Sequence, residues 1–163
     1  MIVIIFDLLR VRNHISFPCD DLLRHYENNR LGSYVYFGIG AMILFLFFPE
    51  QISIPCILCA SITDPFMGEI RHHYSKKSAL LGGFLISFLF FAIIWMHTPI
   101  HIMIPIASIG SISAVIAEKY AGFWIDDDFL MQILPAMMIL IITSLFALNQ
   151  MYLSTPPLNP LFS

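Results

Sequence analysis

Charged side chains are scarce in this sequence. Only 12% of the 163 residues are Asp, Glu, Lys or Arg, whereas soluble chains average about 25%. Hydrophobic residues make up 58%, and the mean hydropathy is +0.81. Such a chain has too few polar side chains to coat a soluble domain of its size. The composition therefore excludes an ordinary soluble globular fold and predicts an integral membrane protein.

Basic residues and cysteines are also few. Eight Lys and Arg against 11 Asp and Glu give a net charge of −3, so the chain lacks the basic surface that nucleic-acid binding requires. Three cysteines form no disulfide framework. Cys56 and Cys59 lie inside an apolar run, which favours helix packing over a metal or redox pair. No Gly-x-x-x-x-Gly-Lys-Ser/Thr motif is present, which excludes the phosphate-loop nucleotide fold.

Long apolar runs, in contrast, occupy most of the chain. Each has about 16 to 20 residues, which at ~1.5 Å per helical residue nearly matches a hydrocarbon core of ~30 Å. The five runs are Leu31 to Phe48, Ile52 to Met67, Ala79 to Met96, Ile100 to Ala117 and Phe129 to Leu148. A sixth run, Met1 to Leu9, has half this length and predicts either a half-span or a start inside a longer gene product.

These runs predict an all-α fold, namely a polytopic transmembrane helix bundle with about five full spans and an N-terminal half-span. We expect residues 1–163 to form a single integral membrane domain. The proline-rich residues 154–163 predict an irregular tail. The lipid bilayer is then an expected partner of the chain. Whether the chain also forms a homo-oligomer is left open by the sequence.

The basic residues predict which side of the membrane each loop faces. With the short N-terminal run ending inside, all eight Lys and Arg fall on one side, which the positive-inside rule identifies as the cytoplasm. Every acidic residue except Glu50 shares that side. Transporters usually place ionisable groups near the bilayer midplane, which is neutral here. Charges of both signs at one face favour an enzyme that takes an anionic cofactor from the cytosol, with ordinary solvated loop charges as the alternative.

The first of two charged clusters follows the second run. Asp64 ends that run, and Gly68 leaves the backbone accessible. Carboxylate oxygens are ligands that Mg²⁺ prefers, and Lys and Arg bind phosphate. The cluster therefore predicts a site for Mg²⁺ and a polyphosphate, built from Asp64, Gly68, Arg71, Lys76, Lys77 and Ser78.

The second cluster lies ahead of the last run. Glu118 is followed by three consecutive aspartates, Asp126, Asp127 and Asp128. An acid at this position favours the positive end of a helix dipole, and that capping role is one interpretation. Capping needs one acid rather than three, so the repulsion among them predicts a bound cation.

These residues, in this order, resemble the CTP-dependent polyprenol kinases, the dolichol and phytol kinase family, which is related to the phosphatidate cytidylyltransferases. The resemblance covers nearly the whole chain except the tail. It rests on Asp7-x-x-Arg10, Glu27, Tyr36-Phe37-Gly38, Thr63-Asp64-Pro65, Lys76-Lys77-Ser78, Glu118 and Asp126-Asp127-Asp128. The family has an acidic residue after its Lys-Lys-Thr loop, where this chain has Leu80-Leu81.

The resemblance implies CTP and Mg²⁺ held at the cytoplasmic face, with phosphate passed to a membrane lipid alcohol. In that mechanism Asp64 and Asp127 bind Mg²⁺, and the side chains of Arg71, Lys76 and Lys77 hold the phosphates. Glu118 or Asp126 orients or deprotonates the lipid hydroxyl. Two alternatives stay open. One is a cytidylyltransferase that forms a CDP-lipid. The other is a non-catalytic membrane subunit that kept the fold and lost the site, which the missing acidic residue favours.

Overall fold

The fold is known from a computed structural model that describes residues 7, 9–11, 31–120 and 126–145. Within these ranges the chain is helical and contains no β-strand, which confirms the all-α prediction. The elements are α2 (Ser33–Phe47), α3 (Glu50–Leu58), the π-helix η3 (Cys59–Thr63), α4 (Asp64–His73), α5 (Lys76–Ile94), α6 (Ile100–Tyr120) and α7 (Asp127–Leu145).

Three of these helices are long and apolar enough to cross a membrane: α5, α6 and the Asp127–Ser144 part of α7. This supports the predicted membrane protein. The shorter helix α2 is also apolar, and the second predicted run coincides with α3, η3 and the start of α4. Five full spans remain a prediction. Most of the predicted N-terminal half-span and the whole tail lie outside the described residues.

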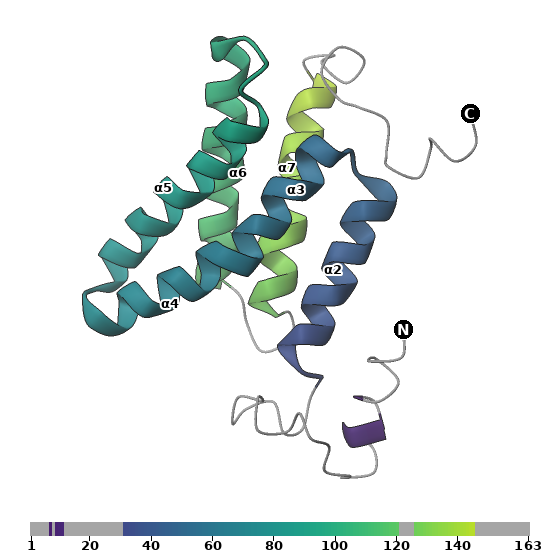
Figure 1. Cartoon of the computed structure of the whole chain (residues 1–163), viewed down its shortest axis with the longest axis vertical. Coiled ribbons are helices and arrows are strands. Elements are labelled where there is room, and N and C mark those ends of the chain that lie inside the picture. Colours follow the sequence, from purple (N-terminus) through teal and green to yellow (C-terminus); the bar gives the residue numbers. More distant parts are fainter. Residues whose placement is uncertain (1–6, 8, 12–30, 121–125, 146–163) are drawn as a thin grey trace.

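Helices α3, η3 and α4 follow one another without a break and run obliquely across the bundle (Figure 1). The widened turn of η3 precedes Pro65, which has no N–H to donate. The Asp64 N–H bonds instead to the Cys59 carbonyl, five residues back. The π-turn therefore lets the helix continue into α4 despite the proline.

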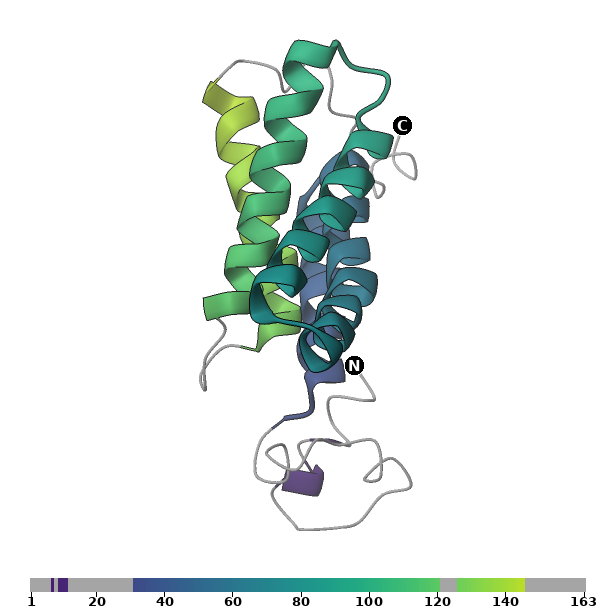
Figure 2. The ribbon, with the colours of Figure 1, turned by 90° about the vertical axis from the view of Figure 1, so that its left-hand side faces the viewer.

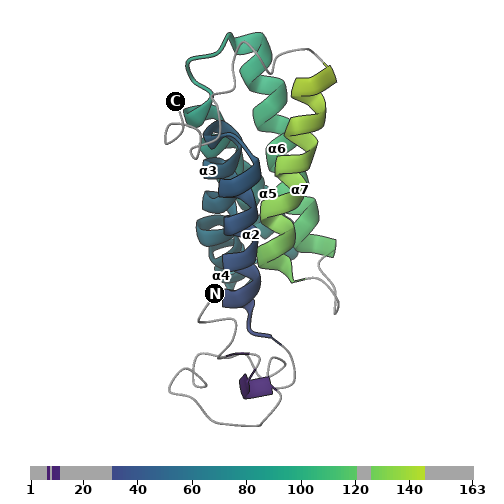
Figure 3. The ribbon, with the colours of Figure 1, turned by 90° about the vertical axis from the view of Figure 1, so that its right-hand side faces the viewer.

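Among the remaining helices, α2, α5 and α7 run in the same direction and α6 runs opposite to them (Figure 1). Helix α6 packs between α5 and α7, as Figure 2 shows, and α7 lies beside α2 (Figure 3). The core draws large buried side chains from these helices, from α3 and from the residue that follows α5: Leu44, Ile52, Phe91, Trp95, Ile106 and Ile139. The turn from α4 to α5, the end of α6 and the starts of α2 and α7 all lie at one end of the bundle (Figure 1).

Helix α5 shows how the side chains divide between the interior and the surroundings. Its buried face repeats every four residues and carries mostly small side chains: Ala79, Gly83, Ser87 and Phe91. Its exposed face repeats with the same period and is wholly apolar: Leu81, Leu85, Leu89 and Ile93. Large apolar residues outside and small residues inside are typical of helices that pack within a bilayer.

Candidate functional site

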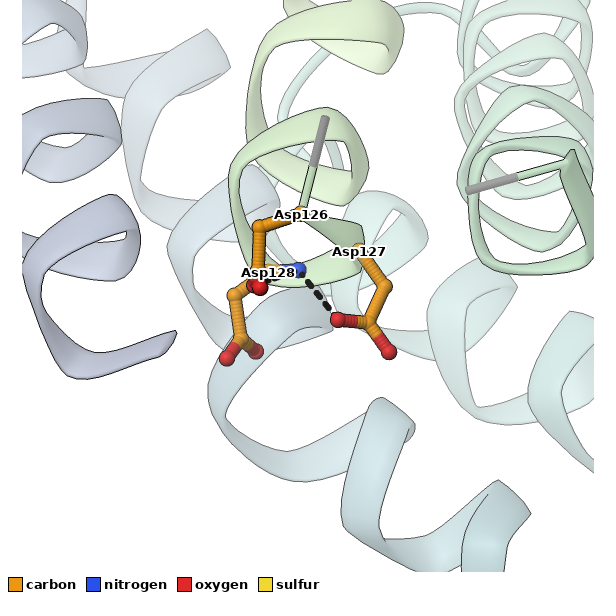
Figure 4. Close-up of side chains that lie close together, drawn as sticks. All are labelled: Asp126, Asp127 and Asp128. Carbon is orange, nitrogen blue, oxygen red and sulfur yellow. Dashed lines mark hydrogen bonds between the residues drawn. The ribbon is translucent and has the colours of Figure 1, made fainter. Parts of the chain in front are cut away.

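Three carboxylates converge at the N-terminal end of α7. Ligand oxygens of Asp126, Asp127 and Asp128 all lie within 4.8 Å of one another (Figure 4). The Asp128 backbone N–H donates to Asp126 Oδ1 and to Asp127 Oδ1, each at 3.2 Å. Both carboxylates therefore cap the first turn of the helix, so the capping interpretation is correct for two of the three aspartates.

Asp126 is the most deeply placed of the three, with 2% of its surface exposed. Its Oδ2 accepts a hydrogen bond from Ser33 Oγ at 3.1 Å, which links the start of α7 to the start of α2. Burial, together with the neighbouring charge of Asp127, raises the pKa of Asp126 above its ordinary value. A divalent cation would offset both effects, because it replaces lost hydration and cancels the repulsion.

The donor set fits Mg²⁺. Hard divalent cations bind carboxylate oxygens. Mg²⁺ usually takes one or two carboxylates and completes its coordination with water and phosphate oxygens. The three aspartates supply such oxygens at one place, with one buried and two partly exposed side chains. Asp127, predicted as a metal ligand, therefore lies where the chemistry allows one.

A second contact joins two predicted site residues that are distant in the sequence. Arg71, in the last turn of α4, forms an ion pair with Glu118, near the end of α6. The Glu118 side chain is only 7% exposed, whereas that of Arg71 is 42% exposed. The carboxylate is thus held inside the bundle end, and the guanidinium keeps an open side that can contact a solute.

Asp64 and Gly68 both lie on α4. Asp64 is the first residue after the π-turn, and π-turns within α-helices are frequent at functional sites. Gly68 is exposed, and a Cβ there would contact nothing within 4 Å. The surface beside Gly68 is therefore open, although the packing itself does not require a glycine at this position.

Lys76, Lys77 and Ser78 form the first turn of α5, and all three are exposed. Ser75 caps this turn by accepting the Ser78 N–H at 3.1 Å, and the Ser75 and Ser78 hydroxyls are 2.9 Å apart. The first turn carries no acidic residue. Two lysines at the positive end of a helix dipole are unfavourable for the helix and favourable for a bound anion.

Asp7, which the resemblance included, has a structural role. Its carboxylate accepts hydrogen bonds from Arg10 Nε at 2.7 Å, Tyr34 Oη at 2.6 Å and the Gly32 N–H at 2.8 Å. Burial opposes ionisation of this carboxyl, but the bonds from Arg10, Tyr34 and Gly32 hold its pKa below the ordinary value. Asp7 thereby ties the N-terminal segment to the start of α2.

The sequence analysis missed Ser33 and Gln132. Ser33 reads as an ordinary helix-start residue, and nothing in the sequence pairs it with Asp126. Gln132 had one visible signal, because it is an amide inside an otherwise apolar run. The structure buries it fully on α7.

No family model, curated protein or solved structure matches this chain. The likeness to the polyprenol kinases stays a prediction that rests on the quoted residues alone.

Proposed function

We propose that this protein is a CTP- and Mg²⁺-dependent kinase that phosphorylates a membrane lipid alcohol of the polyprenol, dolichol or phytol type. The observation that carries the proposal is the convergence of three carboxylates within 4.8 Å at the end of a candidate membrane span. A metal site at that level faces both the water-soluble nucleotide and the hydroxyl end of a lipid.

Each predicted residue has a role in this reaction. Asp127 holds Mg²⁺, with Asp126 and Asp128 completing its acidic environment. Asp64, at the start of α4, is proposed as the second ligand on the resemblance alone. Bound Mg²⁺ supplies neutralisation of the phosphate charge. The phosphates of CTP are held by Arg71, Lys76 and Lys77, beside the open surface at Gly68 and the capped turn at Ser78.

The transfer step requires few other groups. The lipid hydroxyl oxygen forms a bond to the γ-phosphorus, the bond from that phosphorus to the bridging oxygen breaks, and CDP leaves with the electron pair. The hydroxyl proton passes to Asp126. Glu118 acts by holding Arg71 in place, because the two side chains form an ion pair.

The reaction is tested by following where the phosphate goes. Purified protein in detergent, given CTP labelled at the γ-phosphate, Mg²⁺ and a polyprenol, should release CDP and form labelled lipid phosphate. Asp127→Asn and Asp64→Asn should each reduce the rate by at least about 100-fold, since each removes a metal-binding charge at nearly constant volume. Glu69→Gln is the matched control, because Glu69 is an exposed acid on α4 that pairs with His73. It should leave the rate unchanged.

Other products would redirect the assignment. Pyrophosphate release with phosphatidate as acceptor would identify a CDP-lipid-forming cytidylyltransferase. Neither product, together with no Mg²⁺-dependent CTP binding, would identify a non-catalytic membrane subunit and refute the kinase.

The proposal also requires the charged end of the bundle to face the cytoplasm. Tyr74 and His97 are exposed and lie beyond opposite ends of α5. Cysteines placed singly at these two positions, with Cys19 replaced by serine, should react with a membrane-impermeant maleimide from opposite sides. Tyr74→Cys should react from the cytoplasmic side. Labelling of both positions from one side would refute the arrangement.

A further inference from the structure

A buried amide lies between α2 and α7, one helical turn from the aspartates. Gln132 is fully buried, at 0% exposure, inside the candidate span of α7. Burying an amide in apolar surroundings is unfavourable unless its polar atoms find partners. A leucine or methionine would fill the same space without that cost, so the amide itself has a role.

The contacts of Gln132 show what that role is. Its Nε2 donates to the Phe37 carbonyl of α2 at 3.2 Å and to the Asp128 carbonyl at 3.1 Å. One side chain therefore bridges the backbones of two helices, which lie side by side in Figures 1 and 3. One end of the bridge is a residue of the acidic group itself.

Gly40 makes this bridge sterically feasible. A Cβ at Gly40 would lie 2.8 Å from Gln132 Oε1 and 3.0 Å from its Cδ, closer than packed atoms approach. Among the described residues no donor reaches Oε1, so the amide is held by its nitrogen and by contact with Gly40. Gly38, on the same helix, would accept a Cβ with nothing within 4 Å. The requirement for glycine is therefore specific to Gly40.

We propose that Gln132 is a positioning residue for the metal site of Asp126, Asp127 and Asp128. This inference rests on the proposed function, since it takes Asp127, with Asp126 and Asp128 beside it, to bind a divalent cation. Two hydrogen bonds join α2 to the start of α7. Ser33 Oγ donates to Asp126 Oδ2, and about one turn farther along, Gln132 Nε2 donates to the Phe37 carbonyl. The hydrogen bond from Gln132 to Phe37 fixes how the first turn of α7 is rotated about the helix axis. The relative placement of the three carboxylates depends on that rotation.

The test measures cation binding rather than turnover. Mn²⁺, which takes the same oxygen ligands as Mg²⁺, is titrated into purified protein and its free fraction read by EPR, with Mg²⁺ as competitor. Gln132→Met keeps an unbranched chain of similar length and removes the amide, and Gly40→Ala displaces the amide. Each should weaken Mn²⁺ binding by about ten-fold, the scale of changes to groups that orient metal ligands.

The chain offers a matched control for each variant. Thr143 is also buried on α7, but its hydroxyl bonds only to carbonyls of its own helix, those of Ile139 and Leu140. Thr143→Val should leave Mn²⁺ affinity unchanged, as should Gly38→Ala. Thermal unfolding of the same samples confirms that each variant is folded. If Gln132→Met does not fold, the comparison of Gly40→Ala with Gly38→Ala decides.

The outcomes separate this inference from the proposed function. Wild-type protein that binds Mn²⁺, with Gln132→Met and Gly40→Ala binding it equally well, overturns the positioning role alone. A lower unfolding temperature at unchanged Mn²⁺ affinity has the same meaning, because it assigns the amide to packing. Wild-type protein that binds no Mg²⁺-competed Mn²⁺ refutes the metal site and the inference with it.

Discussion

The ion pair between Arg71 and Glu118 predicts an asymmetric response to mutation. The two side chains neutralise each other, yet Glu118 is 7% exposed and Arg71 is 42% exposed. Arg71→Met leaves a nearly buried carboxylate without its partner. Glu118→Gln leaves a guanidinium that water already reaches and that a glutamine oxygen can still bind. We expect the first substitution to be much the more destabilising.

The magnitudes follow from the exposures. Removing one partner of a fully buried pair costs about 3–5 kcal/mol, and the partial exposure of Arg71 reduces this to roughly 2 kcal/mol. Protonating an ordinary glutamate at pH 7 costs about 3.7 kcal/mol, which sets a ceiling because the stranded carboxyl can always take up a proton. Glu118→Gln should cost only about 0–1 kcal/mol, as for exposed pairs.

Thermal unfolding of the purified protein in detergent measures this difference. For a chain of this size, about 2 kcal/mol corresponds to roughly 4–8 °C in the unfolding midpoint. The double variant Arg71→Met, Glu118→Gln should be more stable than Arg71→Met alone, because the buried charge has gone. Equal losses in the two single variants, or a larger loss for Glu118→Gln, would refute the reasoning.

Two further predictions concern packing and the N-terminal segment. A methyl group at Gly110 would lie 2.7 Å from the buried Phe91 ring, so Gly110→Ala should lower stability by about 1–3 kcal/mol, whereas Gly38→Ala should raise it by about 0.4–1 kcal/mol. Unfolding midpoints that shift in the same direction would contradict this. Because hydrogen bonds hold the pKa of Asp7 below its ordinary value of 3.8, its contribution is present above that pH and disappears as the pH falls through the lowered pKa. Wild type should therefore exceed Asp7→Asn in unfolding temperature at pH 7, the difference should shrink as the pH falls through the lowered pKa of Asp7, and a constant difference would exclude this linkage.

The apolar runs predicted where helices occur, but they placed one helix end poorly. The second run ends at Met67, whereas the helix continues as α4 to His73. A hydropathy criterion stops at the first charges, while backbone hydrogen bonding continues through them, because Glu69 and Arg71 are good helix formers. The π-turn before Asp64 was also missed, since it depends on how the helix accommodates Pro65.

Adjacency in sequence predicted part of the candidate site. The three consecutive aspartates were predicted to lie together at a helix start, and the structure places their carboxylate oxygens within 4.8 Å of one another. Contacts between helices were not predicted. The pairing of Arg71 with Glu118 and of Ser33 with Asp126 depends on how each helix is rotated about its axis.

That rotation is hard to predict here for a physical reason. In a soluble protein the polar face of a helix marks the outside, but helices surrounded by lipid are apolar on both faces, so polarity carries little information. Side-chain size carries it instead. On α5 the small residues Ala79, Gly83 and Ser87 recur every four positions and form the buried face. On α2, side-chain size alone does not decide between Gly38 and Gly40 as the packed position. Only Gly40 faces a neighbouring helix, because the side chain of Gln132 on α7 occupies the space beside it. A buried polar side chain therefore determined which small residue packs, and the two must be considered together to orient such a helix.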